Sequence, residues 1–429
     1  MKIKVVRKSY SRVASIKREN HIKPKRANIF FRTLMRLVSA SDLKDARFEC
    51  KDIGMERLGK KEPAFILMNH SSFIDLEIAA TVMYPRPFNI VSTTDGFIGK
   101  RWLMRNIGCI PTKKFINDAA LLSDMKYAIN KLKSSVVMFP EAGYSFDGTS
   151  TTLPNTLGRC VKMLAAPLVM IKTYGAFSRD PLYNNLQKRA VKVTATREYL
   201  LSAEQIAEMS PEQIQHIIDE QFSFDSFAWQ RDNGIKIDEP FRADGLNRVL
   251  YKCPHCLAEG RMKGEGITLT CGECNKSFYL DELGVIRSND TEVRFPHIPD
   301  WYRWQRECVR EEILEGKYSV DIPVDIYMIV DTKCLYSIGE GRLSHTAEGF
   351  HLTGADGELD YFQKPLSSYS LNSDFFWYEI GDVVGIGTSG ELYYCFPRTS
   401  EDIVTKLRLA AEELYKIVYE RKRNKTPKE

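Results

Sequence analysis

The chain has 429 residues, which exceeds the roughly 250–300 residues at which a single hydrophobic core stops growing, so we expect about three folding units. A composition of 43% hydrophobic and 27% charged residues is typical of globular proteins and excludes wholesale disorder. The longest apolar run, residues 163–171, is far shorter than the ~20 residues that cross a bilayer. The start of the chain lacks the apolar stretch of a secretory signal, so we expect a cytoplasmic protein.

The basic charge of the chain is concentrated near its N-terminus. Residues 1–41 hold twelve of the 61 Lys and Arg residues and one acidic residue, Glu19, although the net charge of the whole chain is only +5. Residues 28–40 have a helical spacing that gathers four apolar side chains on one face: Phe30, Leu34, Leu37 and Val38. We expect residues 1–45 to form a basic amphipathic segment that either packs on the next domain or lies on an anionic membrane surface. No nucleic-acid motif accompanies the basic residues, so we expect no nucleic-acid partner.

Residues 46–245 alternate between strand-like apolar runs and helix-like stretches, which predicts an α/β domain. The expected strands are residues 64–68, 88–91, 135–139, 168–171 and 190–194, and the expected helices are residues 73–83, 119–132 and 157–165. Two more helices are expected to begin after Ser202 and Ser210, because each serine is followed three residues later by a glutamine that can complete a capping box.

The most informative stretch is residues 64–75. An apolar strand leads into Asn69 and His70, and a helix opens shortly afterwards with Asp75 in its first turn. A carboxylate there can accept a hydrogen bond from one imidazole nitrogen and leave the other to take a proton from a hydroxyl. Taken alone, this HxxxxD pattern has many chance matches, and the structural alternative is a histidine that caps a helix beside a surface aspartate.

Three further segments supply groups of the same kind. Residues 108–114 form a strand-like segment that ends in two adjacent cations, Lys113 and Lys114. Residues 136–139 form an apolar strand, and the turn that follows contains Glu141, Gly143 and Ser145, with backbone N–H groups that suit an anion. Residues 166–171 form one more apolar strand.

In this order and spacing, the four segments resemble the glycerolipid acyltransferases, the family that includes 1-acylglycerol-3-phosphate acyltransferase, over roughly residues 50–180. The resemblance implies a central mixed sheet flanked by helices, with His70 as the base and Asp75 orienting it. It also implies that five further residues bind the acceptor: Lys113, Lys114, Glu141, Gly143 and Ser145. The implied reaction moves a fatty acyl group from acyl-CoA or acyl carrier protein to a lysophospholipid, by an enzyme docked peripherally on the cytoplasmic face of a membrane.

The chain departs from the family pattern at positions that concern the acceptor. Lys114 stands where the family usually has Arg, and Tyr144 stands where the third motif usually has a second Arg. Lysophosphatidate is the expected acceptor, and another lysophospholipid is the alternative. A different class of function also stays open, namely a non-catalytic lipid-binding scaffold. The presence of both His70 and Asp75 favours an enzyme.

Two CxxC pairs predict a metal site. The four cysteines are Cys253, Cys256, Cys271 and Cys274. At this spacing, two thiolate knuckles close a tetrahedral site, so we predict a zinc ribbon over residues 246–290 with one structural zinc ion. His255 is expected to be a knuckle residue and not a ligand.

Residues 310–429 contain seven short β-like runs followed by an amphipathic helix. This order resembles that of a pleckstrin-homology-like domain, so we expect a β-rich C-terminal domain closed by one helix. A packing or dimerisation module and a second lipid contact both remain open for it.

Overall fold

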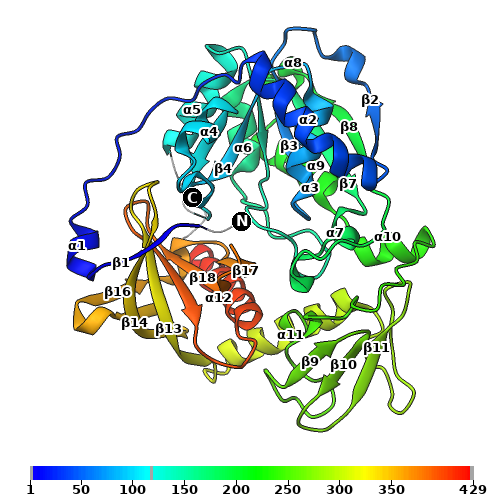
Figure 1. The fold of residues 1–429 in the computed structure, drawn as a ribbon, viewed down its shortest axis with the longest axis vertical. Helices are drawn as coiled ribbons and strands as arrows, with labels where there is room; N and C mark the ends of the chain where they lie inside the picture. Colours follow the sequence, from blue (N-terminus) through cyan, green and yellow to red (C-terminus); the bar gives the residue numbers. More distant parts are fainter. Residues whose placement is uncertain (1–2, 116–118, 426–429) are drawn as a thin grey trace. The chain divides into compact units, whose positions relative to one another are not determined.

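The computed structural model describes residues 3–115 and 119–425, which form two compact units (Figure 1). The α/β unit comprises residues 20–181 and 186–235. The C-terminal unit comprises the residues up to 19, residues 182–185 and the residues from 236 onward. Within the described ranges, no helix has both the length and the apolar character needed to cross a membrane.

The α/β unit contains a mixed sheet whose seven strands, counted over the described residues, lie in the order β2-β8-β7-β3-β6-β4-β5. Its strands are β2 (Glu49–Ile53), β3 (Phe65–Met68), β4 (Phe88–Thr93), β5 (Cys109–Thr112), β6 (Ser135–Met138), β7 (Leu168–Tyr174) and β8 (Thr194–Leu201). Its helices are α2 (Ile29–Asp45), α3 (Ile74–Met83), α4 (Arg101–Asn106), α5 (Ala119–Asn130), α6 (Leu157–Leu164), α7 (Ala176–Arg179), α8 (Ala203–Glu208), α9 (Pro211–Phe222) and α10 (Ser226–Asp232). The strands β3 to β7 are parallel to one another, whereas β2 and β8 run the other way. The predicted α/β fold with a central mixed sheet is confirmed.

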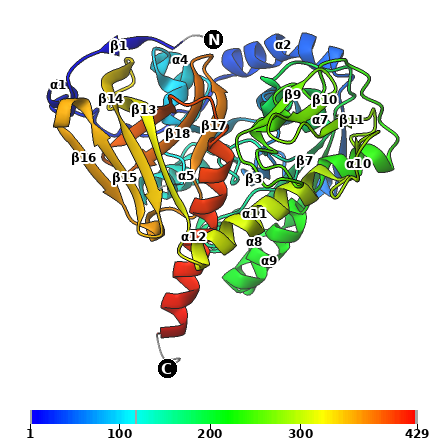
Figure 2. The ribbon, with the colours of Figure 1, turned by 90° about the horizontal axis from the view of Figure 1, so that it is seen from below.

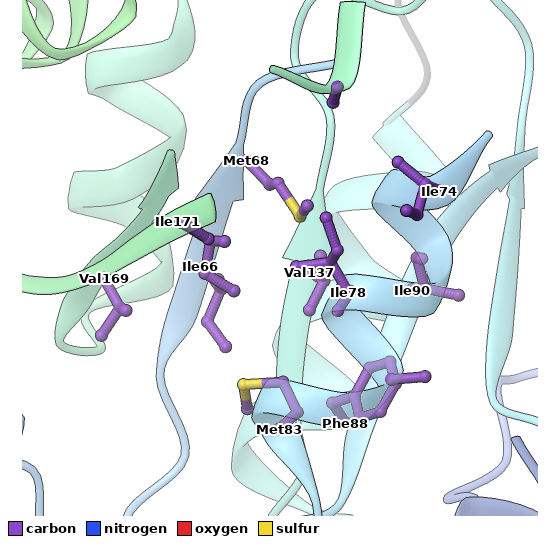
Figure 3. Close-up of a cluster of buried hydrophobic side chains, with 14 of the residues drawn as sticks. Ile66, Met68, Ile74, Ile78, Met83, Phe88, Ile90, Val137, Val169 and Ile171 are labelled. Carbon is purple, nitrogen blue, oxygen red and sulfur yellow. The ribbon is translucent and has the colours of Figure 1, made fainter. Parts of the chain in front are cut away.

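The sheet is buried on both faces because alternate residues of its central strand enter different hydrophobic cores. Ile66 and Met68 of β3 pack with Ile78 of α3, and Figure 3 shows the labelled side chains of α3 pointing toward the strands. Phe65 and Leu67 belong to the core on the opposite face, together with residues of α5, α6 and α9. A strand that is buried on both faces reads as a continuous apolar run, which is why β3 was predictable.

Local signals located the helices better than the two neighbouring strands β2 and β8. Both capping boxes form as predicted, with the Ser202 and Ser210 hydroxyls accepting from the backbone three residues on. The strand expected at residues 190–194 is wrong, because β8 begins at Thr194 and continues to Leu201. The edge strand β2 was missed, since all five of its residues are exposed and carry no apolar pattern.

Helix α2 forms where it was expected, and of the two alternatives for its apolar face, the structure does not show the one in which that face packs on the next domain. Asn28 caps it by accepting from the Phe31 N–H. Ser39 and Leu43 are buried against the unit. The four apolar side chains of the predicted face are exposed instead: Phe30 64%, Leu34 39%, Leu37 67% and Val38 71%.

The C-terminal unit contains two sheets, in which the strands named in this paragraph pair antiparallel. The smaller sheet is formed by β9 (Met262–Glu265), β10 (Thr268–Cys271), β11 (Ser277–Leu280) and β12 (Ile286–Arg287). The larger sheet has the order β16-β15-β14-β13-β19-β18-β17. Its strands are β13 (Ser319–Ile329), β14 (Leu335–Thr346), β15 (Gly349–Gly354), β16 (Leu359–Gln363), β17 (Asn372–Trp377), β18 (Gly381–Gly387) and β19 (Leu392–Pro397). Helices α11 (Ile298–Leu314) and α12 (Val404–Lys425) lie against each other (Figure 2), joined by an ion pair of 2.7 Å between Arg306 and Glu412. The β-rich region with a closing helix agrees with the sequence, and the pleckstrin-homology-like interpretation rests on this order of elements alone.

The basic N-terminal segment is divided between the two units, whereas we expected residues 1–45 to act together. Strand β1 (Val5–Arg7) pairs in parallel with residues 335–337 of β14, and α1 (Tyr10–Ala14) follows it. Glu19 accepts a hydrogen bond of 3.0 Å from the Thr332 hydroxyl. The residues up to 19 therefore belong to the C-terminal unit, and only residues 20–45 remain with the α/β unit.

Candidate functional site

His70 lies in the turn between β3 and α3, at the edge of the sheet where the parallel strands end. Its Nδ1 atom is 3.2 Å from Oδ2 of Asp75. Since a carboxylate only accepts hydrogen bonds, Nδ1 carries the proton and Nε2 is left as the acceptor. The fully buried Asp75 also accepts from the N–H groups of Ser71 at 2.7 Å and Ser72 at 3.0 Å. The predicted pair therefore has the geometry of a general base and its orienting carboxylate.

Two aromatic rings lie against the His70 imidazole. Phe139 stacks on it with a centroid distance of 4.3 Å, and Tyr144 lies against it at 4.4 Å with a tilt of 46°. The His70 side chain keeps 23% of its surface exposed. A hydroxyl that gives its proton to Nε2 approaches in the plane of the ring, because the lone pair of Nε2 lies in that plane.

Glu141 accepts hydrogen bonds from the backbone of the turn that contains His70. Its Oε2 accepts from the His70 N–H at 2.7 Å, and its Oε1 accepts from the Thr151 N–H at 2.9 Å. Burial raises the pKa of this carboxyl to about 7, and the two backbone hydrogen bonds oppose that shift. Because both oxygens accept from backbone N–H groups and the residue is only 3% exposed, Glu141 ties the His70 turn to residue 151. Its expected contact with the acceptor stays a prediction.

The two other residues expected in this turn have different surroundings. The Ser145 hydroxyl donates to the Thr149 carbonyl at 2.6 Å and accepts from the Gly148 N–H at 2.9 Å, so it stabilises the turn. A Cβ atom placed on Gly143 would meet no heavy atom within 4 Å. Gly143 is therefore the open position of this turn, whereas Ser145 is 4% exposed.

Lys113 and Lys114 follow β5, at the same edge of the sheet as His70. The order β3-β6-β4-β5 separates them from His70 by three strand spacings, or roughly 14 Å at the usual distance between strands. The structure thus places the two cations on the same edge of the sheet as His70 without bringing them into contact with the imidazole. Both are partly buried.

Two polar residues of this site were not assigned a role from the sequence. The Asn69 side chain accepts from the Thr173 N–H at 2.8 Å and donates to the Thr173 carbonyl at 3.2 Å, which joins the ends of β3 and β7. Asp180 accepts a hydrogen bond of 2.7 Å from the Ser72 hydroxyl. Asn69 stands beside His70 and was open to prediction, but nothing local links residue 180 to residue 72.

The four predicted metal ligands meet in the C-terminal unit. Their Sγ atoms all lie within 4.8 Å of one another, and this is the one such cluster of His, Cys, Asp and Glu ligands in the described part of the chain. The Sγ distances from Cys253 to Cys274 and from Cys256 to Cys271 are both 3.7 Å. Four thiolates at ~2.3 Å from a zinc ion form a tetrahedron with edges of about 3.8 Å. The cluster can therefore hold a metal ion of this size.

The two cysteine knuckles have the same backbone form. Leu257 and Asn275, each directly after the second cysteine of its pair, have positive φ angles of 63° and 57°. His255 is not part of the thiol cluster; its Nε2 lies 3.2 Å from the Glu292 carbonyl oxygen and its ring stacks on Phe278. Its expected role as a knuckle residue stays a prediction.

Part of the α/β unit matches the model of a known protein family. Residues 49–180 match the family model described as Acyltransferase, a stretch that begins with β2, ends at Asp180 and contains His70 and Asp75. The match supports an acyltransferase domain in this chain.

One similar solved structure is the 1-acyl-sn-glycerophosphate acyltransferase of Thermotoga maritima, at 15% identity and a TM-score of 0.36. The similarity covers 44% of this chain and 76% of that protein. A search of the curated proteins finds no match.

Proposed function

We propose that this chain is an O-acyltransferase that moves a fatty acyl group from acyl-CoA or acyl carrier protein to 1-acylglycerol-3-phosphate, giving phosphatidate. The observation that carries the proposal is the His70 and Asp75 pair, set at the carboxyl edge of a mixed sheet inside the segment that matches the acyltransferase family model. The notable departure is Tyr144, which lies on His70 where the resemblance leads one to expect a cation. That departure supports a second candidate acceptor, another lysophospholipid.

The proposed reaction needs no covalent enzyme intermediate. Nε2 of His70 takes the proton of the acceptor hydroxyl while the hydroxyl oxygen attacks the thioester carbonyl. Asp75 stabilises the imidazolium that forms, because it is buried and already held by two backbone N–H groups. When the tetrahedral species collapses, the C–S bond breaks and the thiolate leaves. The imidazolium returns the proton to it, so the free thiol and the new ester are the products.

We propose further that the enzyme docks on the cytoplasmic face of an anionic membrane through a docking surface on the α/β unit. This surface consists of Phe30, Leu34, Leu37 and Val38 of α2 with Trp102 of α4. Trp102 is 70% exposed, and its ring contacts that of Phe31 edge to face at 5.9 Å, which joins the two helices. Exposed apolar side chains beside basic residues are the features of an interfacial helix. Lys25, Arg26 and Arg36, all exposed, supply those charges.

We propose that the cysteine cluster holds one structural zinc ion. Four thiolate ligands complete a tetrahedral coordination shell, which supports folding of the ribbon and leaves no position for a substrate. The four Sγ atoms fit such a shell.

The test of acyl transfer uses purified protein with acyl-CoA and lysophosphatidate in mixed micelles, and it follows both free thiol and phosphatidate. We expect wild type to form phosphatidate and His70→Ala to lose at least ~100-fold in rate, as is usual when a general base is removed. His216→Ala is the matched control, since His216 lies on α9 with a side chain that is 74% exposed. Silence of all three proteins with a panel of lysolipids and acyl donors would favour the lipid-binding scaffold.

A further inference from the structure

A series of buried polar side chains links the turn that carries His70 to Asp180. The Ser72 hydroxyl donates a hydrogen bond of 2.7 Å to Oδ1 of Asp180, and the two residues are 0% and 3% exposed. Ser72 precedes α3, whereas Asp180 follows α7, so the bond joins segments 108 residues apart. In an interior site, a satisfied hydrogen bond of this kind fixes the position of both partners.

Ser72 passes this constraint on to the catalytic pair. Its N–H donates to Oδ2 of Asp75 at 3.0 Å, and that same oxygen faces Nδ1 of His70 at 3.2 Å. Anchoring the Ser72 side chain limits the movement of its backbone and so of its N–H. The orientation of the Asp75 carboxylate therefore depends in part on what holds the Ser72 hydroxyl, beside the Ser71 N–H at 2.7 Å and the Thr173 hydroxyl at 3.5 Å.

Asp180 is held in turn by a buried cation. Arg179 is 3% exposed, with Nη1 at 3.5 Å from Asp180 and Nη2 at 2.6 Å from Asp42 of α2. Burial raises the pKa of Asp180 to about 7, while the Ser72 hydrogen bond and the Arg179 charge both lower it. In either protonation state Asp180 keeps an oxygen that can accept from Ser72.

We propose that Asp180 is a positioning residue of the active site, which acts through Ser72 to hold Asp75 in line with His70. The proposal rests on the proposed acyl transfer and assigns Asp180 no contact with substrate. Loss of the link lets Asp75 turn away from the imidazole. The chemical step then slows, while substrate binding is unchanged.

The kinetic test compares Ser72→Ala, Asp180→Ala and the double variant. We expect each single variant to lower kcat about tenfold with KM unchanged, which is less than the ~100-fold that a 1 Å misplacement can cost, because the Ser71 N–H still holds Asp75. The double variant should be no slower than the slower single variant, because both substitutions remove the same link. Asp180→Asn should recover most of kcat, since its amide oxygen can still accept from Ser72.

Two controls separate positioning from general damage to the fold. Ser39→Ala removes another buried serine hydroxyl, one that donates only within its own helix to the Met35 carbonyl, and should leave kcat as in wild type. If Asp180→Ala does not fold, Ser72→Ala decides the matter alone, because it leaves the Arg179 and Asp180 pair in place. Unchanged kcat in a folded Ser72→Ala variant overturns the proposal. Independent, multiplying effects in the double variant also overturn it.

A second measurement does not depend on activity. In protein labelled with ¹⁵N-histidine, the Nδ1 proton of His70 should give a downfield resonance, which His70→Ala identifies by its loss. We expect Ser72→Ala and Asp180→Ala to shift or broaden this resonance and Ser39→Ala to leave it unchanged. An inactive wild type with the expected spectra would refute acyl transfer but keep the positioning link. An active wild type whose resonance is the same in all variants would refute the link alone.

Discussion

Replacing two residues of the docking surface should weaken membrane binding without harming the fold. In Leu37→Ser with Val38→Ser, the altered side chains are already 67% and 71% exposed, so their loss removes little core packing. Burying a Leu or Val side chain fully contributes about 1.5–3 kcal/mol. Because roughly two thirds of each is available to the membrane, we expect a loss of about 3 kcal/mol for the pair. This corresponds to a ~100-fold weaker partition onto vesicles.

The assay is sedimentation with vesicles that contain anionic lipid, over a range of lipid concentrations. Met163→Ser is the matched control, because Met163 is an apolar residue of a helix in the same unit and is 47% exposed. Point substitutions isolate the surface better than deletion of residues 1–41, which would also remove β1 and the contacts of Met35 with the core. If the double variant partitions like wild type, or if Met163→Ser weakens binding equally, α2 is not the docking element.

Three further predictions concern stability. Burial first, and then Asp42, raises the pKa of Glu77 from 4.5 to about 7, so the stabilisation from this carboxyl is complete below pH 4.5 and is lost as pH rises through 7. Glu77→Gln should therefore raise Tm at pH 8 but not at pH 4. We expect a stabilisation of about 1 kcal/mol, reduced because Glu77 is only half-buried, which corresponds to a rise in Tm of ~2–4 °C. Calorimetry at both pH values measures this difference. Cys256→Ser should release the zinc and lower the thermal stability of the C-terminal unit, whereas Cys308→Ser, outside the cluster, should keep one zinc per chain by elemental analysis. Asn69→Ala leaves the Thr173 N–H unpaired and should cost about 1–3 kcal/mol in urea denaturation.

Much of the candidate site was predictable because its signals are local. The strand β3 is an unbroken apolar run, and His70 and Asp75 are five residues apart, so chain geometry alone brings them together. The cysteine pairs were predictable for the same reason, since each knuckle sets the separation of its two thiols. The capping boxes of α8 and α9 also depend only on residues three apart.

What the sequence did not show depends on tertiary contacts. Helical spacing located α2, but both of its faces carry apolar residues, and periodicity alone does not say which of them packs. Glu141 was read as a group for the acceptor, and only the structure shows its two oxygens engaged by N–H groups of His70 and Thr151. The three residues of β1 are too few for a periodic pattern, and their partner strand begins at Leu335.

The pairing of β1 with β14 sets an order of events during synthesis. Because Val5 pairs with Leu335, about 330 residues separate the two strands in the chain, and a ribosome needs roughly 15–65 s to make them. The whole α/β unit, which ends at residue 235, emerges within that interval. It can therefore fold while the first strand of the C-terminal unit still lacks its neighbour. The C-terminal unit is thus completed by residues that leave the ribosome before the α/β unit does.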